Sequence, residues 1–324
     1  MAPPIYTESV CPDLRHRLVP ARDFNQSEAA IGCPAPASSH HPHPMPSNLV
    51  FSINRISGSS MPFRAFAAMA QRLGVRHIEI RNDLAGVELE DGTGAGEVGT
   101  IASSHGLTIR SINALQRFDQ FDTAREADAH ALAGYAEQCG ALSLVLCPTN
   151  NRQDQRDAAR RHDDLVGALT RLAPLLAGHG ITGLLEPLGF EECAMRRKSQ
   201  AVAAMRDSGN SGLFALVHDT FHHHLAGENR FFADQTGLVH ISGVEDPQLP
   251  ACDMRDSHRV LVGPADRLDN LGQLRHLHGA GYRGVASFEP FAADIATADD
   301  IETRLRASMD YLLSALGATP HNAD

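Results

Sequence analysis

The sequence has no excess of basic residues and no basic cluster of useful size. Lys and Arg number 28 against 39 Asp and Glu, which gives a formal net charge of −11 over 324 residues. The densest basic run, MRRKSQ at 195–200, is short and is typical of the start of a solvated helix. Because a protein that binds nucleic acid needs a positive face for the phosphate backbone, we expect no nucleic-acid partner.

Long apolar runs and paired cysteine motifs are missing as well. No uninterrupted apolar segment approaches the roughly 20 residues needed to cross a bilayer, and the N-terminus lacks the pattern of a secretory signal. The six cysteines include no C-x-x-C motif and no regular spacing, which is typical of free thiols. We therefore expect a cytoplasmic protein without membrane contact, and the sequence leaves a homo-oligomer open.

Residues 1–47 differ in composition from everything that follows. The stretch CPAPASSHHPHPMPS is rich in Pro, Ser and His, and no helical or strand period precedes it. Such a composition buries too little apolar surface to offset the entropy of ordering. We expect a disordered arm over 1–47, one folded domain over 48–318 and a tail over 319–324. Met45 is a candidate start of translation, so a protein that begins there should still fold.

Eight short apolar runs alternate with helix-forming stretches after the arm. The runs are LVFSIN (49–54), HIEIR (77–81), TIRSINAL (108–115), LSLVLCP (142–148), ITGLLEP (181–187), FALVHD (214–219), LVHISG (238–243) and GVASFEP (284–290). Between them, stretches at 62–74, 128–140, 163–180 and 268–281 have the apolar period of a helix and stop at glycine. The alternation predicts a closed (β/α)8 barrel, the TIM-barrel fold. An open doubly wound sheet would carry a Gly-rich phosphate turn after its first strand, and RISGSSMP is not such a turn.

Polar residues finish or interrupt the last four apolar runs, where a barrel carries its chemistry. They are Glu186, Asp219, His240 and Glu289. Taken singly, a carboxylate at a strand end is often a helix N-cap and a histidine in a strand is often a core residue. Three converging carboxylates, however, would repel one another, and burying each without a partner is costly. A divalent cation removes both problems, so the four residues predict one site for Mn²⁺, Mg²⁺, Co²⁺ or Zn²⁺.

The stretch LVHDTFHHHLAG at 216–227 places three histidines directly after Asp219. We expect His222 to lie above the metal site, against a substrate oxygen. His224 is a second candidate for a substrate contact, whereas His223 should face away, toward the surface. Strand alternation directs His218 to the helix side of the barrel.

These residues make the sequence resemble the xylose isomerase-like barrel superfamily of sugar isomerases and epimerases, and within it the inosose (2-keto-myo-inositol) isomerases. The resemblance covers nearly all of 49–316 and is carried by IEIRNDL (78–84), INAL (112–115), LLEPLG (184–189), HDTFHHHLAG (218–227), VHIS (239–242), HRVLVG (258–263) and SFEPF (287–291). It implies a TIM barrel that acts on a small polyol or sugar in inositol catabolism.

The resemblance also implies roles for single residues. It implies one divalent metal held by the four residues at the strand ends, with His222 and Arg259 on the substrate. Two departures concern the substrate more than the metal. After Arg259 the chain reads VGPADRLD in place of a P-G-x-G-like turn, and Ser242 and Gly243 stand where inosose isomerases can carry acidic residues.

The chemistry expected of such a site is the movement of a carbonyl along a polyol. It requires removing a proton next to the carbonyl and stabilising an enediolate, and Glu186 and Glu289 are the candidate proton shuttles. A ketose 3-epimerase or a hydroxypyruvate-type isomerase would use the same site. An endonuclease-IV-like DNA repair enzyme would need three metals and a basic face, and a sugar-binding barrel without turnover would not need both glutamates.

Overall fold

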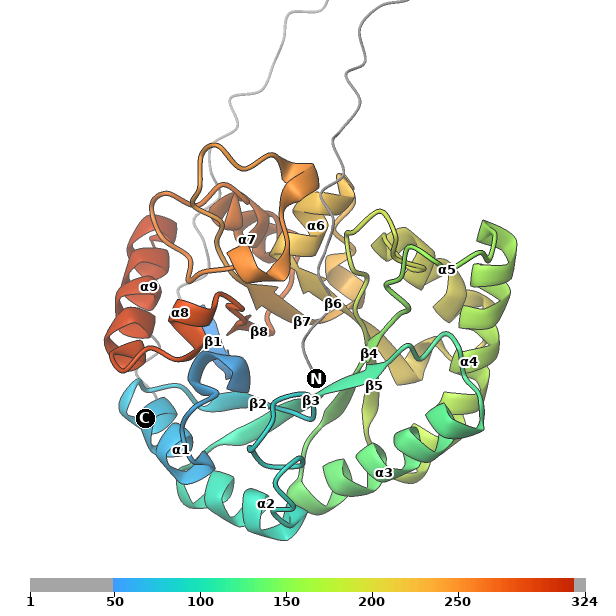
Figure 1. Ribbon diagram of the computed structural model, residues 1–324, viewed down its shortest axis with the longest axis horizontal. Coiled ribbons are helices and arrows are strands. Elements are labelled where there is room, and N and C mark those ends of the chain that lie inside the picture. The colour runs from blue at the N-terminus through green and yellow to red at the C-terminus, as the bar shows by residue number, and fades with distance from the viewer. Residues whose placement is uncertain (1–48, 318–324) are drawn as a thin grey trace, which may run out of the picture. The chain divides into compact units, whose positions relative to one another are not determined.

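Eight parallel strands form one closed barrel in the computed structural model, which describes residues 49–317 (Figure 1). They are β1 (Val50–Asn54), β2 (His77–Arg81), β3 (Thr108–Gln116), β4 (Ser143–Cys147), β5 (Thr182–Leu185), β6 (Phe214–Asp219), β7 (Thr236–Ile241) and β8 (Val285–Phe288). Each strand pairs with the next in the chain, and β8 closes the barrel on β1. The predicted fold is confirmed, whereas the expected arm at 1–47 and the tail at 319–324 lie outside the described residues.

Helices surround the barrel on its outer side (Figure 1). They are α1 (Phe63–Arg72), α2 (Ala95–Ser104), α3 (Thr123–Cys139), α4 (Ala158–Gly178), α5 (Lys198–Asp207), α6 (Thr220–Ala226), α7 (Asn270–Gly279), α8 (Ala293–Ala296) and α9 (Ile301–Leu316). Short 3-10 helices follow β1 at Arg55–Gly58 and lie at Ser211–Leu213, Ala233–Gln235, Ala251–Asp253 and Asp256–His258. No helix in the described range is both long and apolar enough to span a membrane.

Helices α3 and α4 begin before the stretches whose apolar period predicted them. Their N-caps are Asp122 and Asp157, whose carboxylates accept from the backbone N–H three residues later at 2.9 and 2.8 Å. These caps add a polar first turn to each helix. The C-terminal end of α3 is where the sequence predicts it, because Gly140 takes the left-handed conformation with φ 75°.

The inside of the barrel changes from apolar to polar along each strand. Buried apolar side chains form one layer, which includes Val145, Leu184, Val217, Leu238 and Val285. Alternate residues of a strand share one face, so the residues two positions later also point inward. They are Cys147, Glu186, Asp219, His240 and Ser287, all buried. The barrel therefore carries its polar groups at the carboxyl ends of the strands, above an apolar floor.

Candidate metal centre

The four predicted metal ligands meet at the carboxyl ends of β5 to β8. Glu186, Asp219, His240 and Glu289 each offer a ligand atom, and these atoms lie within 4.8 Å of one another. Both glutamates come directly after a strand, and their backbone N–H groups still donate to carbonyl groups of the neighbouring strands at 3.1 and 2.9 Å. The barrel ladder therefore fixes the direction of both glutamates.

The imidazole of His240 lies at the centre of this group. Its Nδ1 is 2.8 Å from Glu186 Oε1, 3.2 Å from Glu289 Oε2 and 3.9 Å from Asp219 Oδ2. Burial opposes a charge on the ring, but the neighbouring carboxylates, Glu289 foremost, raise the pKa of His240 well above its usual value. Carboxylates this close together need a cation among them. Three carboxylate oxygens and one imidazole nitrogen also match the donors that divalent metals take, so the residues fit a bound metal ion.

The other imidazole nitrogen points at Glu79, a residue that sequence reasoning missed. Glu79 is fully buried on β2, and its Oε2 lies 3.1 Å from His240 Nε2. Ser111 and Asn113 donate to the same oxygen at 2.5 and 2.8 Å. Burial alone would raise the pKa of Glu79, but the charge and hydrogen bond of His240 lower it to about 2. The signal in the sequence was a glutamate inside the strand HIEIR, on the inward face two residues before its end.

Asp219 serves two purposes at once. Its Oδ1 accepts from the backbone N–H of Phe221 and His222 at 2.7 and 3.0 Å, so it is the N-cap of α6. Its Oδ2 is turned toward His240 and lies 2.6 Å from Arg259 Nη2. The N-cap interpretation of a strand-end carboxylate is therefore correct for Oδ1, whereas the metal-ligand interpretation concerns Oδ2 and stays a prediction.

Two buried arginines hold Glu289. Arg259 Nη2 donates to Glu289 Oε2 at 3.0 Å, and Arg81 Nη1 donates to Oε1 at 2.8 Å. Burial alone would raise the pKa of Glu289, but His240 and the arginines hold it well below its usual value. Arg259 Nε also donates to Ser242 Oγ at 2.9 Å, so the serine at a position where the sequence departs from the inosose isomerases orients the arginine.

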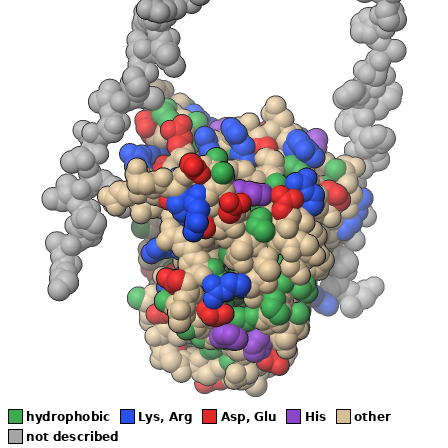
Figure 2. Space-filling model, turned by 90° about the vertical axis from the view of Figure 1, so that its right-hand side faces the viewer, with side chains coloured by type: hydrophobic (Ala, Val, Ile, Leu, Met, Phe, Trp, Pro, Cys, Tyr) green, Lys and Arg blue, Asp and Glu red, His purple; other side chains and the backbone are tan. Residues whose placement is uncertain are grey.

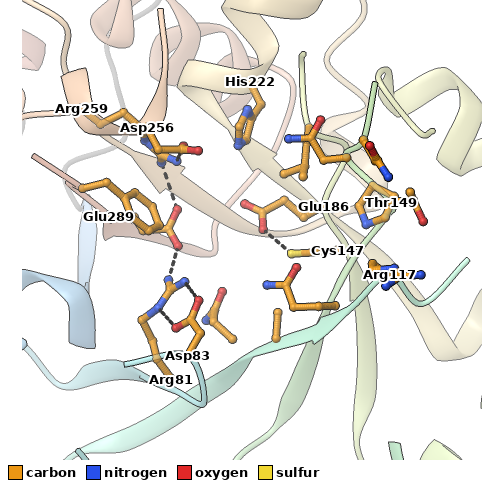
Figure 3. A pocket seen from close by; sticks show the side chains of 18 residues that line it. Arg81, Asp83, Arg117, Cys147, Thr149, Glu186, His222, Asp256, Arg259 and Glu289 are labelled. Atoms are coloured by element: carbon orange, nitrogen blue, oxygen red, sulfur yellow. Dashed lines mark hydrogen bonds and ion pairs between the residues drawn. The ribbon is translucent and has the colours of Figure 1, made fainter. Parts of the chain in front are cut away.

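A cavity of about 560 Å³ opens above the centre (Figure 3). Four of the predicted site residues line it, namely Glu186, His222, Arg259 and Glu289. Asp219 and His240 do not line it; they are buried beside Glu186 and Glu289, only 3% and 0% exposed. Cys147 also lines the cavity, and burial followed by the charge of Glu186 raises the pKa of its thiol well above the usual value. The thiol therefore stays protonated and donates to Glu186 Oε2 at 3.4 Å.

His222 projects into the cavity from the first turn of α6. Its ring packs edge-on against Phe190 and Phe221, with centroids 5.2 Å from each. The close approach of α6 depends on Gly189, because a Cβ there would collide with the His222 carbonyl oxygen. His222 thus lines the same cavity as Glu186 and Glu289, and its contact with a substrate stays a prediction.

The structure does not bring His224 to the cavity. His224 is half-buried, and the charges nearest to it are those of Asp266, Arg267 and Asp269. The reason is that Thr220–Ala226 forms a helix. Residues two apart on a helix point in nearly opposite directions, so His222 and His224 cannot share one site.

His218 and His223 lie on the outer side of β6 with a buried lysine. Lys198 Nζ lies 3.1 Å from His218 Nδ1 and 2.6 Å from His223 Nδ1. Burial, followed by the charge of Lys198, lowers the pKa of both rings, so they remain neutral acceptors. His218 faces the helices as predicted, whereas His223 is half-buried in this cluster and not free at the surface. Lys198 belongs to the run MRRKSQ, which was expected to be solvated, yet it is only 4% exposed.

The family model that describes the xylose isomerase-like TIM barrel matches residues 67–315. The chain belongs to this family. A xylose isomerase domain-containing protein from Salmonella typhimurium LT2 is 33% identical, with a TM-score of 0.75, and the match covers 81% of this chain and 97% of that one. Among curated proteins, none matches the chain significantly.

More distant members of the fold have known ligands. The IolI protein, whose structure holds a zinc atom, is 20% identical with a TM-score of 0.72 over 83% of this chain and 99% of its own. D-psicose 3-epimerase from Clostridium cellulolyticum H10, solved with D-tagatose, is 15% identical with a TM-score of 0.62 over 83% of this chain and 99% of its own. At these identities the likeness shows a shared fold alone.

Proposed function

We propose that the protein is a divalent-metal-dependent isomerase that moves a carbonyl along a cyclic polyol or sugar, with inososes as the first substrates to test. The observation that carries the proposal is the position of Glu186, which lines the cavity and also belongs to the buried ligand set. One carboxylate there can face both a cation and the carbon next to a substrate carbonyl. The zinc atom in the similar IolI structure supports the same interpretation.

The metal would be held by Glu186, Asp219, His240 and Glu289. The chemistry that such an ion supplies when bound is polarisation of the substrate carbonyl and its neighbouring hydroxyl. Four protein ligands with oxygen and imidazole donors are compatible with Mn²⁺, Mg²⁺, Co²⁺ and Zn²⁺.

The two glutamates are not equivalent as bases. Both oxygens of Glu289 accept from guanidinium groups, those of Arg81 and Arg259, and these bonds stabilise its ionised form. Among the described residues, the Oε2 atom of Glu186 accepts only from the weak thiol donor of Cys147. Glu186 is therefore the better proton acceptor, and Glu289 the better fixed anion.

One base is enough for an isomerisation. Glu186 would take the proton from the carbon next to the carbonyl and return it to the former carbonyl carbon on the same face. Arg259 and His222 line the cavity beside it and would hold the two substrate oxygens between which the hydroxyl proton passes. The charge of Arg259 would stabilise the enediolate oxygen.

A ketose 3-epimerase is the second candidate, because similar structures include such enzymes. An epimerase removes the proton on one face and returns it on the other, so Glu289 would also have to carry a proton. A hydroxypyruvate-type isomerase would use Glu186 alone. An endonuclease-IV-like enzyme would need three metals and a basic face. The described residues contain one group of possible metal ligands, and on the face in Figure 2 acidic and basic side chains are interspersed. A three-metal, DNA-binding enzyme is accordingly not proposed.

The experiment is an NMR screen of inososes and ketohexoses with added Mn²⁺, Co²⁺, Mg²⁺ or Zn²⁺. The substrates carry deuterium next to the carbonyl and the solvent is H₂O. We expect part of the deuterium to appear on the former carbonyl carbon, because one base carries it there. A product with an inverted centre and no internal transfer would favour the epimerase. If no substrate turns over or exchanges its proton with solvent, the proposal is wrong and the barrel binds sugars without turnover.

A further inference from the structure

One arginine at the cavity lacks the oppositely charged partner that the other charged lining residues have. Among the charged residues that line the cavity, Arg81 pairs with Asp83 at 2.6 Å, Arg259 with Asp256 at 3.1 Å, and Glu186 with the ring of His240 at 2.8 Å. Glu289 is held by both arginines. Arg117 forms no ion pair with any residue in the described range, and its Nη2 donates to the neutral amide of Gln120 at 2.8 Å.

The carboxylates nearest to Arg117 in the chain are engaged elsewhere. Asp119 is buried and accepts from Arg156 at 2.6 Å and from the backbone N–H of Thr149 at 2.6 Å. Asp122 is the exposed N-cap of α3; the backbone N–H of Arg125 is the first cause of its lowered pKa and Arg117 the last. Arg117 is exposed to solvent and therefore adds a positive charge to the cavity wall that no carboxylate in the described range pairs with directly, although Asp122 is close enough to feel its charge.

The backbone holds Arg117 in a disfavoured conformation. Its φ is 54°, in the left-handed region that arginine rarely adopts, directly after β3. The turn is fixed by Phe118, which is fully buried and whose N–H donates to the Cys147 carbonyl at 3.2 Å. The same turn makes Arg117 line the cavity. Strain of this kind persists where the surroundings enforce it, and it is concentrated at functional sites.

Arg117 lies across the cavity from Arg259, whereas Arg81 ends β2, the strand next to β3. In the closed order of strands, β3 is four strands away from β7, after which Arg259 comes. Figure 3 shows Arg117 beyond Glu186 and Cys147, on the other side of the cavity from Glu289. The cavity lining includes several polar, uncharged residues, namely Asn113, Gln116, Thr149, Asn150 and Asn151. Amides and hydroxyls of this kind suit the hydroxyl groups of a polyol, with Arg117 at the end.

We propose that Arg117 binds a single anionic group, a carboxylate or a phosphate monoester, at the end of the substrate remote from the carbonyl. The substrate would then be an acidic member of the sugar and polyol class proposed above. The planar guanidinium matches both anions through two parallel hydrogen bonds. The idea rests on the proposed function for the position of the reacting carbonyl, but the binding preference can be measured without turnover.

The test is calorimetry on the full chain with matched ligands. A neutral ketohexose is compared with the corresponding ketohexonic acid and with the ketohexose 6-phosphate, for the wild type, Arg117→Gln and Arg117→Lys. Because a hydrogen bond to a charged group contributes roughly ten- to hundredfold in affinity, we expect at least one anion to bind that much more tightly than the neutral sugar. The preference should be lost in Arg117→Gln and partly kept in Arg117→Lys. Whichever anion binds more tightly identifies the group.

The matched control is Arg152→Gln. Arg152 is also an arginine near this wall, but its side chain is 67% exposed, pairs with Glu192 and does not line the cavity. It should keep the wild-type preference. Equal binding of neutral and anionic sugars by the wild type, or an unchanged preference in Arg117→Gln, would overturn the inference. Arg117-dependent binding without turnover would leave the inference intact and refute the proposed reaction instead.

Discussion

Replacing Glu79 with glutamine tests how the metal centre is held. Nε2 of His240 lies 3.1 Å from Glu79 Oε2, so a hydrogen on Nε2 would be donated to this carboxylate and Nδ1 would be left to bind a metal. Ser111 and Asn113 donate to the same oxygen, and Ser287 donates to the other. Glutamine keeps the volume of the side chain, but it removes the charge and turns an NH₂ group toward side chains that are themselves donors.

The expected effect follows from the charge on this hydrogen bond. A hydrogen bond to a charged group contributes about 1.5–3 kcal/mol, and loss of the carboxylate behind a metal-binding histidine typically weakens metal binding by roughly 10- to 100-fold. We expect Glu79→Gln to bind Mn²⁺ or Zn²⁺ more weakly by about this factor, although Glu79 is not itself a ligand. Competition against a chromophoric chelator measures the affinity directly and needs no substrate.

The control is Glu302→Gln, which removes a carboxylate that pairs with Arg72 at 2.7 Å on the surface. Its metal affinity should equal that of the wild type. Circular dichroism and urea unfolding show whether the Glu79→Gln barrel is intact. An intact barrel with wild-type metal affinity would refute the role of Glu79 in orienting His240.

Three other predictions follow from the same contacts. Glu186→Gln and Asp219→Asn should each lose metal by orders of magnitude in elemental analysis, and stoichiometric metal in both would show that the ligand set is wrong. His222→Ala should lower kcat/KM by about 10²-fold with normal metal content, whereas His223→Ala should change kinetics only a few-fold; equal losses in steady-state assays would contradict this. Burial lowers the pKa of Lys198 from 10.5 to about 8, so between these pH values the unfolded chain binds more protons than the folded one. The urea unfolding free energy should therefore rise with pH in this window, and Lys198→Met should lack that rise.

The sequence predicts the strands better than the starts of the helices. The runs HIEIR and FALVHD coincide with β2 and β6, because a buried parallel strand is apolar along nearly its whole length. Helices α3 and α4 begin earlier than their apolar periods, at turns fixed by Asp122 and Asp157. The first turn of a surface helix is solvated, so an apolar period does not mark where it begins.

The sequence predicts those site residues whose direction follows from the alternation of side chains along a strand. Glu186, Asp219, His240 and Glu289 could be placed together because each ends or interrupts a strand of one barrel. Glu79 lies on the same inward face, and the alternation within HIEIR would have found it.

The sequence could not predict side-chain contacts between separate helices and strands. The partners of Lys198 depend on how α5 packs against β6 and α6, which no local pattern encodes. The position of His224 depends on the helix that follows β6: His222 and His224 are two residues apart on α6, where they point in nearly opposite directions.

The buried charges around the centre do not balance without a further cation. Four buried carboxylates face two buried guanidinium groups, which leaves two negative charges; the groups are Glu79, Glu186, Asp219 and Glu289 against Arg81 and Arg259. The other carboxylates that contact the arginines, those of Asp83 and Asp256, are 37% and 46% exposed and are screened by solvent. One divalent ion beside a neutral His240 brings the sum to zero, whereas a proton on His240 leaves one negative charge.

Binding of the metal should therefore displace a proton. Nδ1 of His240 cannot hold a proton and a metal together, and the neighbouring carboxylates raise the pKa of His240 well above its usual value despite its burial. The raised pKa favours a protonated ring in the metal-free protein, so we expect about one proton to be released for each ion bound. At pH values below the pKa of His240, the metal affinity should then increase about tenfold for each unit by which the pH is raised. Calorimetry in buffers of different ionisation enthalpy counts the protons, and metal binding without proton release would mean that His240 is not a ligand.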